Sequence, residues 1–232
     1  MKVQLTKTFF AEAAHRNPGG PPKTRRLHGH SYEIVLVVEG DVTSEFGWLI
    51  DYGDITAAFK PIYQHIDHAL LNDIPDLDEP TVPGLRDWIL RKLAPALPGL
   101  KDVRVAIVGD CTYAPEVIPP CPGTDQPGAI RFTFEAAQSL AQLPDTHKCR
   151  RMHGHSYRVE VAANDPEVLR EPLRDVYELL DHTCLNDVPG LEIATCEVIC
   201  HWLWQRLAAC PAGIRAVAVQ ETPSARCTYY GE

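Results

Sequence analysis

Residues 23–38 read KTRRLHGHSYEIVLVV, and residues 148–163 read KCRRMHGHSYRVEVAA. Both stretches carry a His-Gly-His triplet and then run into apolar and β-branched residues, which predicts a β-strand. Further matching blocks flank them in the same order: FFAEAAH (9–15) with FTFEAAQ (132–138), and IDHALLNDIP (66–75) with LDHTCLNDVP (180–189). Repeated blocks in one order predict a tandem duplication of one structural unit.

The segment between the two copies differs in composition from the rest of the chain. Residues 114–128 read APEVIPPCPGTDQPG and include five prolines and two glycines. Such a stretch cannot continue a helix or a central strand, so it predicts a stiff, extended linker. We therefore expect a first unit at 1–114, a linker at 115–128 and a second unit at 129–232.

Each unit is predicted to have an α+β fold. In the first unit the apolar pattern predicts strands at 6–15, 31–39 and 48–52, a helix through 55–66, a second helix capped by Thr81, and a strand at 103–108. The first two strands should pair as an antiparallel hairpin. The second copy is shorter between its repeated blocks, and we expect it to lack the strand equivalent to 48–52.

Composition and charge restrict the class of protein. The 232 residues are 45% hydrophobic and 23% charged, as in a globular protein, and the net charge of −9 argues against nucleic acid or an anionic membrane as partner. The amino terminus lacks the apolar core of a secretory signal, and no stretch is long enough to span a membrane. The eight cysteines form no C-x-x-C pair. These features predict a reduced, cytoplasmic protein.

Three histidines of the first unit form a candidate metal site. His28 and His30 are two residues apart, so on a strand their side chains share one face, and a hairpin would bring His15 beside them. Three imidazoles that leave an open position are typical of catalytic zinc. The alternative is a solvated pair of histidines on a strand. In the second unit Gln138 replaces His15, so we expect metal binding there to be lost or weak.

A cysteine marks the second unit instead. Cys149 stands four residues before His153, whereas the equivalent position in the first unit is Thr24. The positive charges of the neighbouring Lys148, Arg150 and Arg151 should favour the thiolate, which suits a nucleophile or a general base. The alternative is a buried, unreactive thiol.

Paired aspartate and histidine residues follow the first helix of each unit. In Asp67-His68 and Asp181-His182 the carboxylate could orient the imidazole and make it a proton shuttle, although a helix-end aspartate beside a surface histidine would look the same. Glu221 follows the last predicted strand, where the first unit has the shorter Asp110. A carboxylate there could accept two hydrogen bonds from a guanidine-like heterocycle, or it could simply be exposed.

Together these motifs resemble the 6-pyruvoyl tetrahydropterin synthase / 6-carboxy-tetrahydropterin synthase family. The resemblance rests on His15 with RRLHGHSY and IDHALLND in the first unit, and on CRRMHGHSY, LDHTCLND and Glu221-Thr222 in the second. It implies a tunnelling fold, in which each unit is an antiparallel sheet with two helices on one face and the units assemble into a barrel. It also implies a homo-oligomer with active sites built across subunit interfaces.

The resemblance also implies roles for individual residues. Zn²⁺ would be held by His15, His28 and His30. Cys149 would be the catalytic base, and Asp67, His68, Asp181 and His182 would be catalytic. Glu221 and Thr195 would bind the substrate, which is 7,8-dihydroneopterin triphosphate or a related pterin, and the reaction would be that of a carbon-oxygen lyase.

The two units have lost different residues, which leads to a hypothesis of a composite site. Zinc held by the first unit would face Glu221, and also Asp181-His182, from the second unit. The alternative is a pterin-binding or non-catalytic, barrel-completing relative, because Thr24 removes the base beside the intact histidines.

Overall fold

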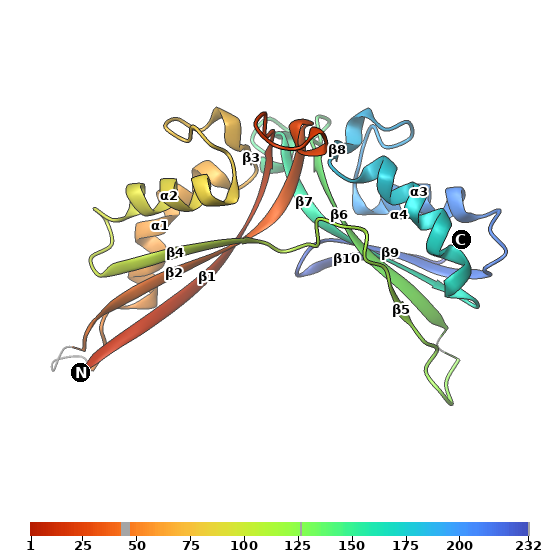
Figure 1. Ribbon diagram of the computed structural model, residues 1–232, viewed down its shortest axis with the longest axis horizontal. Helices are drawn as coiled ribbons and strands as arrows, with labels where there is room; N and C mark the ends of the chain where they lie inside the picture. The colour runs from red at the N-terminus through yellow and green to blue at the C-terminus, as the bar shows by residue number, and fades with distance from the viewer. Residues whose placement is uncertain (43–46, 126, 232) are drawn as a thin grey trace.

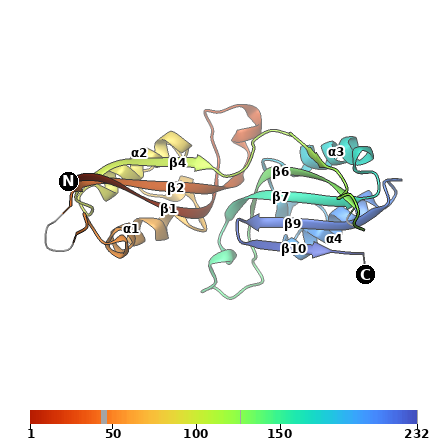
Figure 2. The same cartoon turned by 90° about the horizontal axis from the view of Figure 1, so that it is seen from below.

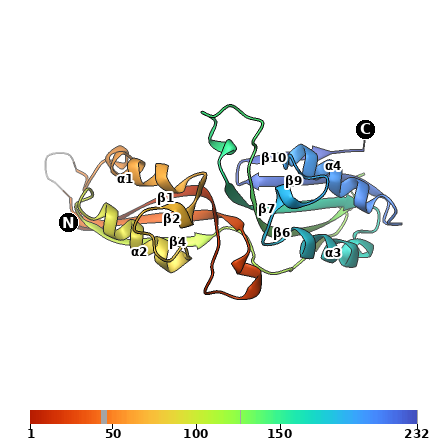
Figure 3. The same cartoon turned by 90° about the horizontal axis from the view of Figure 1, so that it is seen from above.

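The computed structural model describes residues 1–42, 47–125 and 127–231, so residue 126 of the predicted linker and residues 43–46 and 232 of the predicted units lie outside the described residues. The chain forms two sheets, and each sheet carries two α-helices on one face (Figure 1). The uncovered faces are seen from below in Figure 2, and the helices lie in front in the view from above in Figure 3. None of the described helices is both long and apolar enough to cross a membrane.

The first sheet has the strand order β3-β1-β2-β4. Its strands are β1 (Lys2–His15), β2 (His28–Asp41), β3 (Ala69–Leu70) and β4 (Leu100–Ile107), and its helices are α1 (Tyr52–Ile66) and α2 (Val82–Leu93). The β1/β2 and β2/β4 pairs are antiparallel, and the two-residue β3 runs parallel to β1.

The second sheet has the strand order β10-β9-β7-β6-β5, with the short β8 parallel to β6. Its strands are β5 (Glu116–Ile118), β6 (Gly128–Gln138), β7 (His153–Ala163), β8 (Thr183–Cys184), β9 (Ile214–Thr222) and β10 (Ala225–Tyr229), and its helices are α3 (Arg170–Leu180) and α4 (Cys196–Leu207). Single 3₁₀ turns lie at η1 (Pro22–Arg25), η2 (Leu71–Asp73), η3 (Lys148–Arg150), η4 (Pro166–Leu169) and η5 (Leu185–Asp187).

The main elements of the first unit agree with the sequence pattern. The two long strands pair as a hairpin, and the Thr81 side chain caps α2 by accepting a hydrogen bond from the Gly84 backbone N–H. The strand predicted at 48–52 is wrong, because Asp51 caps a helix that begins at Tyr52. The predicted linker is only partly irregular, since β5 pairs with β6 as an edge strand.

Alternation along β2 separates a core face from a face that meets the second unit. One face of the strand carries the even-numbered residues, among them His28, His30 and Ile34. The opposite face carries Gly29 and Ser31. The even-numbered set continues into a core between the sheet and its two helices, which includes Leu36, Val38, Ile55, Phe59, Leu85 and Ile89. The histidines are therefore an extension of the buried apolar face.

The two units contact each other where β2 and β7 cross, with almost no space between their backbones. The backbone N–H of Ser31 donates to Ser156 Oγ at 3.1 Å, and the Ser156 N–H donates to Ser31 Oγ at the same distance. A Cβ atom added to Gly29 would overlap the Cα atom of Gly154, and the reverse is also true. Glycine is required on both strands because only a hydrogen atom fits at this crossing.

The sheets of one chain do not close into the expected barrel. They form two separate sheets that diverge from the crossing of β2 and β7 (Figure 1). In the part of the chain that the structure describes, each sheet ends in open edges, so closure into a barrel with further copies stays a prediction.

Replacing Gly29 with alanine should destabilise the junction of the units. The new methyl group would overlap Gly154 and lie 2.7 Å from the carbonyl oxygen of Ala13, so both strands must shift. We expect a loss of about 1–3 kcal/mol in the free energy of unfolding, measured by urea titration. Gly19→Ala is the matched control, because its nearest neighbour would be 3.8 Å away. Equal unfolding midpoints for the two variants would contradict this account of the crossing.

Candidate functional site

The first histidine cluster is assembled by the register of the β1/β2 hairpin. His15 lies directly opposite His28, and His30 follows two residues later on the same face. All three side chains are buried, and one ring nitrogen from each lies within 4.8 Å of the other two. The Nε2 atoms of His15 and His30 are 3.1 Å apart. The structure thus brings together the three predicted metal ligands.

Hydrogen bonds at the other ring nitrogen orient each imidazole. His28 Nδ1 lies 2.8 Å from the carbonyl oxygen of Arg26, His15 Nδ1 contacts the carbonyl oxygen of Pro80, and His30 Nδ1 lies 2.7 Å from Glu135 Oε2. With a proton on each Nδ1, the lone pairs of the Nε2 atoms face one another. Glu135 belongs to β6, so the second unit orients a ligand of the first.

The electrostatics of this cluster suit a cation. Burial lowers the pKa of His15 to about 4 and that of His30 to about 3, so both are neutral at neutral pH. Two Nε2 lone pairs 3.1 Å apart repel each other unless a cation lies between them, and bonds of about 2.0 Å to one zinc ion give a similar nitrogen separation. The residues therefore fit a zinc ion with an open coordination position.

A histidine of the second unit covers this cluster. The His182 ring stacks on His28 with ring centroids 4.4 Å apart, and His182 Nδ1 donates to Asp181 Oδ2 at 2.7 Å. Lys23 Nζ binds the same carboxylate oxygen at 2.7 Å. His182 has a φ angle of 56°, a left-handed conformation that is uncommon for histidine, and its backbone N–H donates to the Glu135 carbonyl at 2.5 Å.

The second cluster repeats this arrangement with the units exchanged. Asp67-His68 of the first unit faces His153 and His155 of the second, and the His68 ring stacks on His153 at 4.4 Å. Lys148 Nζ lies 3.2 Å from Asp67 Oδ2, and this contact is the counterpart of the 2.7 Å contact between Lys23 and Asp181 in the first cluster. Burial acts to raise the pKa of Asp67, but the hydrogen bond and the charge of His68 outweigh it and lower the pKa to about 2.

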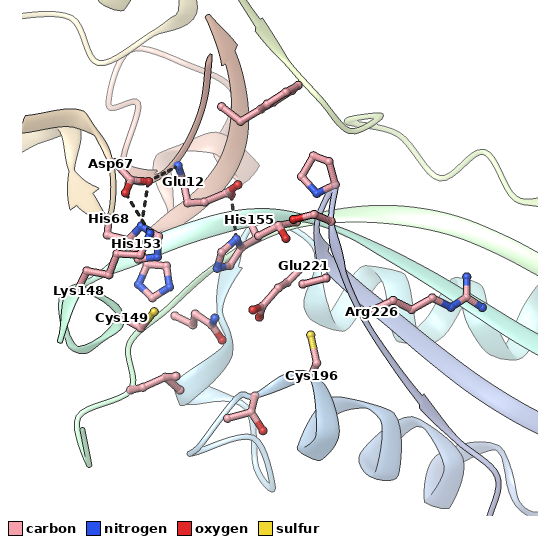
Figure 4. Close-up of a pocket in the computed structure, with 18 of the residues that line it drawn as sticks. Glu12, Asp67, His68, Lys148, Cys149, His153, His155, Cys196, Glu221 and Arg226 are labelled. Atoms are coloured by element: carbon pink, nitrogen blue, oxygen red, sulfur yellow. Dashed lines mark hydrogen bonds and ion pairs between the residues drawn. The ribbon is translucent and has the colours of Figure 1, made fainter. Parts of the chain in front are cut away.

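A cavity of about 730 Å³ opens onto this second cluster (Figure 4). Cys149 and Glu221 both line it, together with the Asp67-His68 pair and the amide of Gln138. Thr195 also lines the cavity, and its side chain caps α4 by accepting a hydrogen bond from the Val198 N–H. Residues of both units therefore surround one space of a size suited to a small organic ligand.

Two expectations need correction. Within one chain Glu221 lines the cavity of the second cluster, so it does not face the zinc ligands of the first unit; only Asp181-His182 does. The pKa of the Cys149 thiol is raised by burial, not lowered. The charge of Lys148 acts to lower this pKa, but burial, together with the carboxylates of Glu221 and Asp67, outweighs it.

Two glutamates that the sequence motifs did not single out hold the clusters together. Glu135 Oε2 accepts from Ser156 Oγ at 2.6 Å besides binding His30, and Glu12 Oε2 accepts from Ser31 Oγ at 2.5 Å and binds His155 Nδ1 at 2.8 Å. Both residues are buried, and each is followed by two buried alanines. The signal was present, because the EAA block is repeated three residues before His15 and Gln138.

Several known proteins are each similar to about half of this chain. A 6-carboxy-5,6,7,8-tetrahydropterin synthase from Synechocystis is 38% identical over 122 residues, which cover 50% of this chain and 93% of that protein. A dihydroneopterin monophosphate aldolase from Pyrococcus furiosus is 32% identical over 99 residues, or 43% of this chain and 82% of the aldolase. The structure of 6-pyruvoyl tetrahydropterin synthase from Caenorhabditis elegans aligns with a TM-score of 0.42 and 17% identity, covering 47% of this chain and 90% of that one.

The family model for 6-pyruvoyl tetrahydropterin synthase matches this chain twice, at residues 4–113 and 129–232. The first match contains both helices and most of the strands of the first sheet, and the second match contains the second sheet and its helices except for β5 and the first residue of β6. The chain therefore belongs to the 6-pyruvoyl tetrahydropterin synthase family and carries the unit of that family in duplicate.

Proposed function

We propose that this protein is a pterin lyase and that its substrate binds in the cavity of the second cluster. The observation that carries the proposal is the presence of Cys149, Glu221 and Asp67-His68 around one space of about 730 Å³. An acid-base set and a hydrogen-bonding carboxylate then lie within reach of one ligand. The relatives named as tetrahydropterin synthases and as a dihydroneopterin aldolase support the same class of substrate.

Glu221 is the residue we assign to the pterin ring. The guanidine-like edge of a pterin presents two adjacent N–H groups, and a carboxylate accepts both at once. Thr195 lies at the start of α4, where it lines the same cavity. The substrate of this assignment is 7,8-dihydroneopterin triphosphate or a related dihydropterin.

Cys149 and Asp67-His68 are the groups we assign to proton transfer. Cys149 removes a proton from a side-chain carbon or hydroxyl of the pterin, and His68, oriented by Asp67, returns a proton to the product. The 2.9 Å hydrogen bond between His68 Nδ1 and Asp67 fixes the ring orientation and leaves Nε2 directed away from Asp67. Asp181-His182 has the equivalent geometry at the first cluster, where we assign it the same role.

Zinc is the cofactor we assign to His15, His28 and His30. A zinc ion there would act as a Lewis acid toward oxygen atoms of a bound pterin. The contribution of the chain is to keep the three imidazoles neutral, buried and oriented through Arg26, Pro80 and Glu135. Because barrel closure needs further chains, we also propose a homo-oligomer.

A second candidate function is pterin binding without turnover. Thr24 stands where the first cluster would need its thiol, and Gln138 stands where the second would need its third imidazole. Neither cluster of one chain therefore has the complete set of family residues. Binding of a dihydropterin with no release of triphosphate or aldehyde would favour this candidate.

The roles of Glu221 and Cys149 can be separated by mutation. Glu221→Gln should weaken dihydropterin binding about 10- to 100-fold, because a hydrogen bond to a charged group contributes about 1.5–3 kcal/mol. Cys149→Ser should leave binding within about threefold and lower turnover by at least about 100-fold. Calorimetry measures the first effect and product release the second. Cys121→Ser, at an exposed cysteine, is the control. A Cys149→Ser variant with full turnover would overturn the assignment of the base.

Zinc binding at the first cluster is tested by metal analysis of dialysed protein. His28→Ala should hold one zinc ion fewer per chain than the unmodified protein, because two imidazoles bind zinc much more weakly than three. His65→Ala changes an exposed histidine and should not alter the metal content. Unchanged zinc in His28→Ala would mean that the cluster is not a metal site.

A further inference from the structure

We propose that Gln138 and His153 bind adjacent hydroxyl groups on the side chain of the pterin, without a metal ion. This inference rests on the proposed function, because it names the part of that ligand which the second cluster recognises. Gln138 lies directly opposite His153 in the β6/β7 register, as His15 lies opposite His28 in the first unit. An amide therefore stands where the first cluster has an imidazole.

Two buried atoms of these side chains have no hydrogen-bond partner in the part of the chain that the structure describes. They are Oε1 of Gln138, a residue that is 2% exposed, and Nε2 of His153, which is fully buried. Both residues line the cavity of the second cluster. Because a buried polar atom without a hydrogen bond is unfavourable, this pair indicates that a polar group of a ligand binds here.

Both atoms are hydrogen-bond acceptors. His153 Nδ1 donates to the Arg151 carbonyl oxygen at 2.8 Å, which leaves the lone pair of the ring on Nε2. Burial lowers the pKa of His153 to about 3, so the ring is neutral and keeps that lone pair at neutral pH. The amide oxygen of Gln138 also accepts. Two neighbouring acceptors are complementary to two O–H donors, whereas a carbonyl group or a carboxylate has no proton to donate.

The distance from the proposed ring site determines where these hydroxyl groups lie on the ligand. In the β7/β9 pair Arg158 lies opposite Gln220, so Glu221 lies at the level of Tyr157. His153 precedes Tyr157 by four residues, which is about 13 Å along the strand. The hydroxyl groups therefore belong to an arm that extends from the ring, and not to the ring itself.

An oxygen atom bound at His153 lies beside the groups assigned to proton transfer (Figure 4). One ring nitrogen of His153, one ring nitrogen of His68 and Cys149 Sγ lie within 4.8 Å of one another. A carbon atom that carries the bound hydroxyl is then within reach of the thiol and the imidazole. Gln138 and His153 thus bind and orient the side chain, and Cys149 and His68 keep their proton-transfer roles.

The test compares two ligands by calorimetry on the full chain, both as purified and after metal removal with a chelator. 7,8-Dihydroneopterin carries hydroxyl groups on its side chain, and 6-methyl-7,8-dihydropterin carries none. Both protein samples should bind dihydroneopterin at least about 30-fold more tightly, because the methyl ligand leaves both acceptors unpaired.

Gln138→Leu removes one of the two acceptors. It should weaken dihydroneopterin binding about tenfold and leave binding of the methyl ligand within about threefold. The melting temperature should not fall, since leucine replaces a buried amide oxygen that has no partner among the described residues. Gln205→Leu, at an exposed glutamine of α4, is the matched control and should change neither affinity.

The possible results separate this inference from the proposed function. Equal affinities of the unmodified protein for the two ligands would overturn the inference and leave the pterin site intact. A preference for dihydroneopterin that disappears on metal removal, or that is unchanged in Gln138→Leu, would overturn it as well. If neither ligand binds the unmodified protein, the proposed function itself fails.

Discussion

Two hydrogen bonds between a buried glutamate and a histidine of the opposite unit connect the whole arrangement. Glu135 holds His30 at 2.7 Å, and Glu12 holds His155 at 2.8 Å. Each glutamate lies three residues before a ligand position on its own strand, so the two side chains point to opposite faces. Each of these two strands therefore contributes to both clusters. Its last residue belongs to one cluster, and its glutamate binds a histidine of the other cluster. Loss of either carboxylate would leave a buried imidazole without its orienting partner.

Because each cluster contains residues of both units, neither unit forms a complete cluster alone. The crossing at Gly29 and Gly154 brings the hairpins close enough for the glutamates to reach across, and the same approach stacks His182 on His28 and His68 on His153. After duplication the two clusters could diverge while sharing this frame. The first kept three imidazoles, and the second kept the thiol, the glutamate at the end of β9 and the large cavity.

Much of the fold could be predicted from the sequence because the repeated blocks mark its buried parts. The hairpin and the helix capped by Thr81 follow from local alternation and capping, which are short-range effects. The strand expected at 48–52 does not form. The short apolar run there predicts a strand, but Asp51 caps the helix that begins at Tyr52. The family resemblance, more than any pattern of spacing, supplied the roles of Thr195 and Glu221.

The relation between the two clusters could not be predicted in the same way. It depends on how one unit packs against the other, which local sequence does not specify, so Glu221 was expected at the wrong cluster.

A crystal structure of the zinc-loaded protein with a bound dihydropterin tests most directly whether both units build one binding site. We predict that the ring binds Glu221 in the cavity, beside Asp67-His68 from the other unit of the same chain. A ring bound at His15, His28 and His30, with Glu221 of that chain left in solvent, would contradict this account.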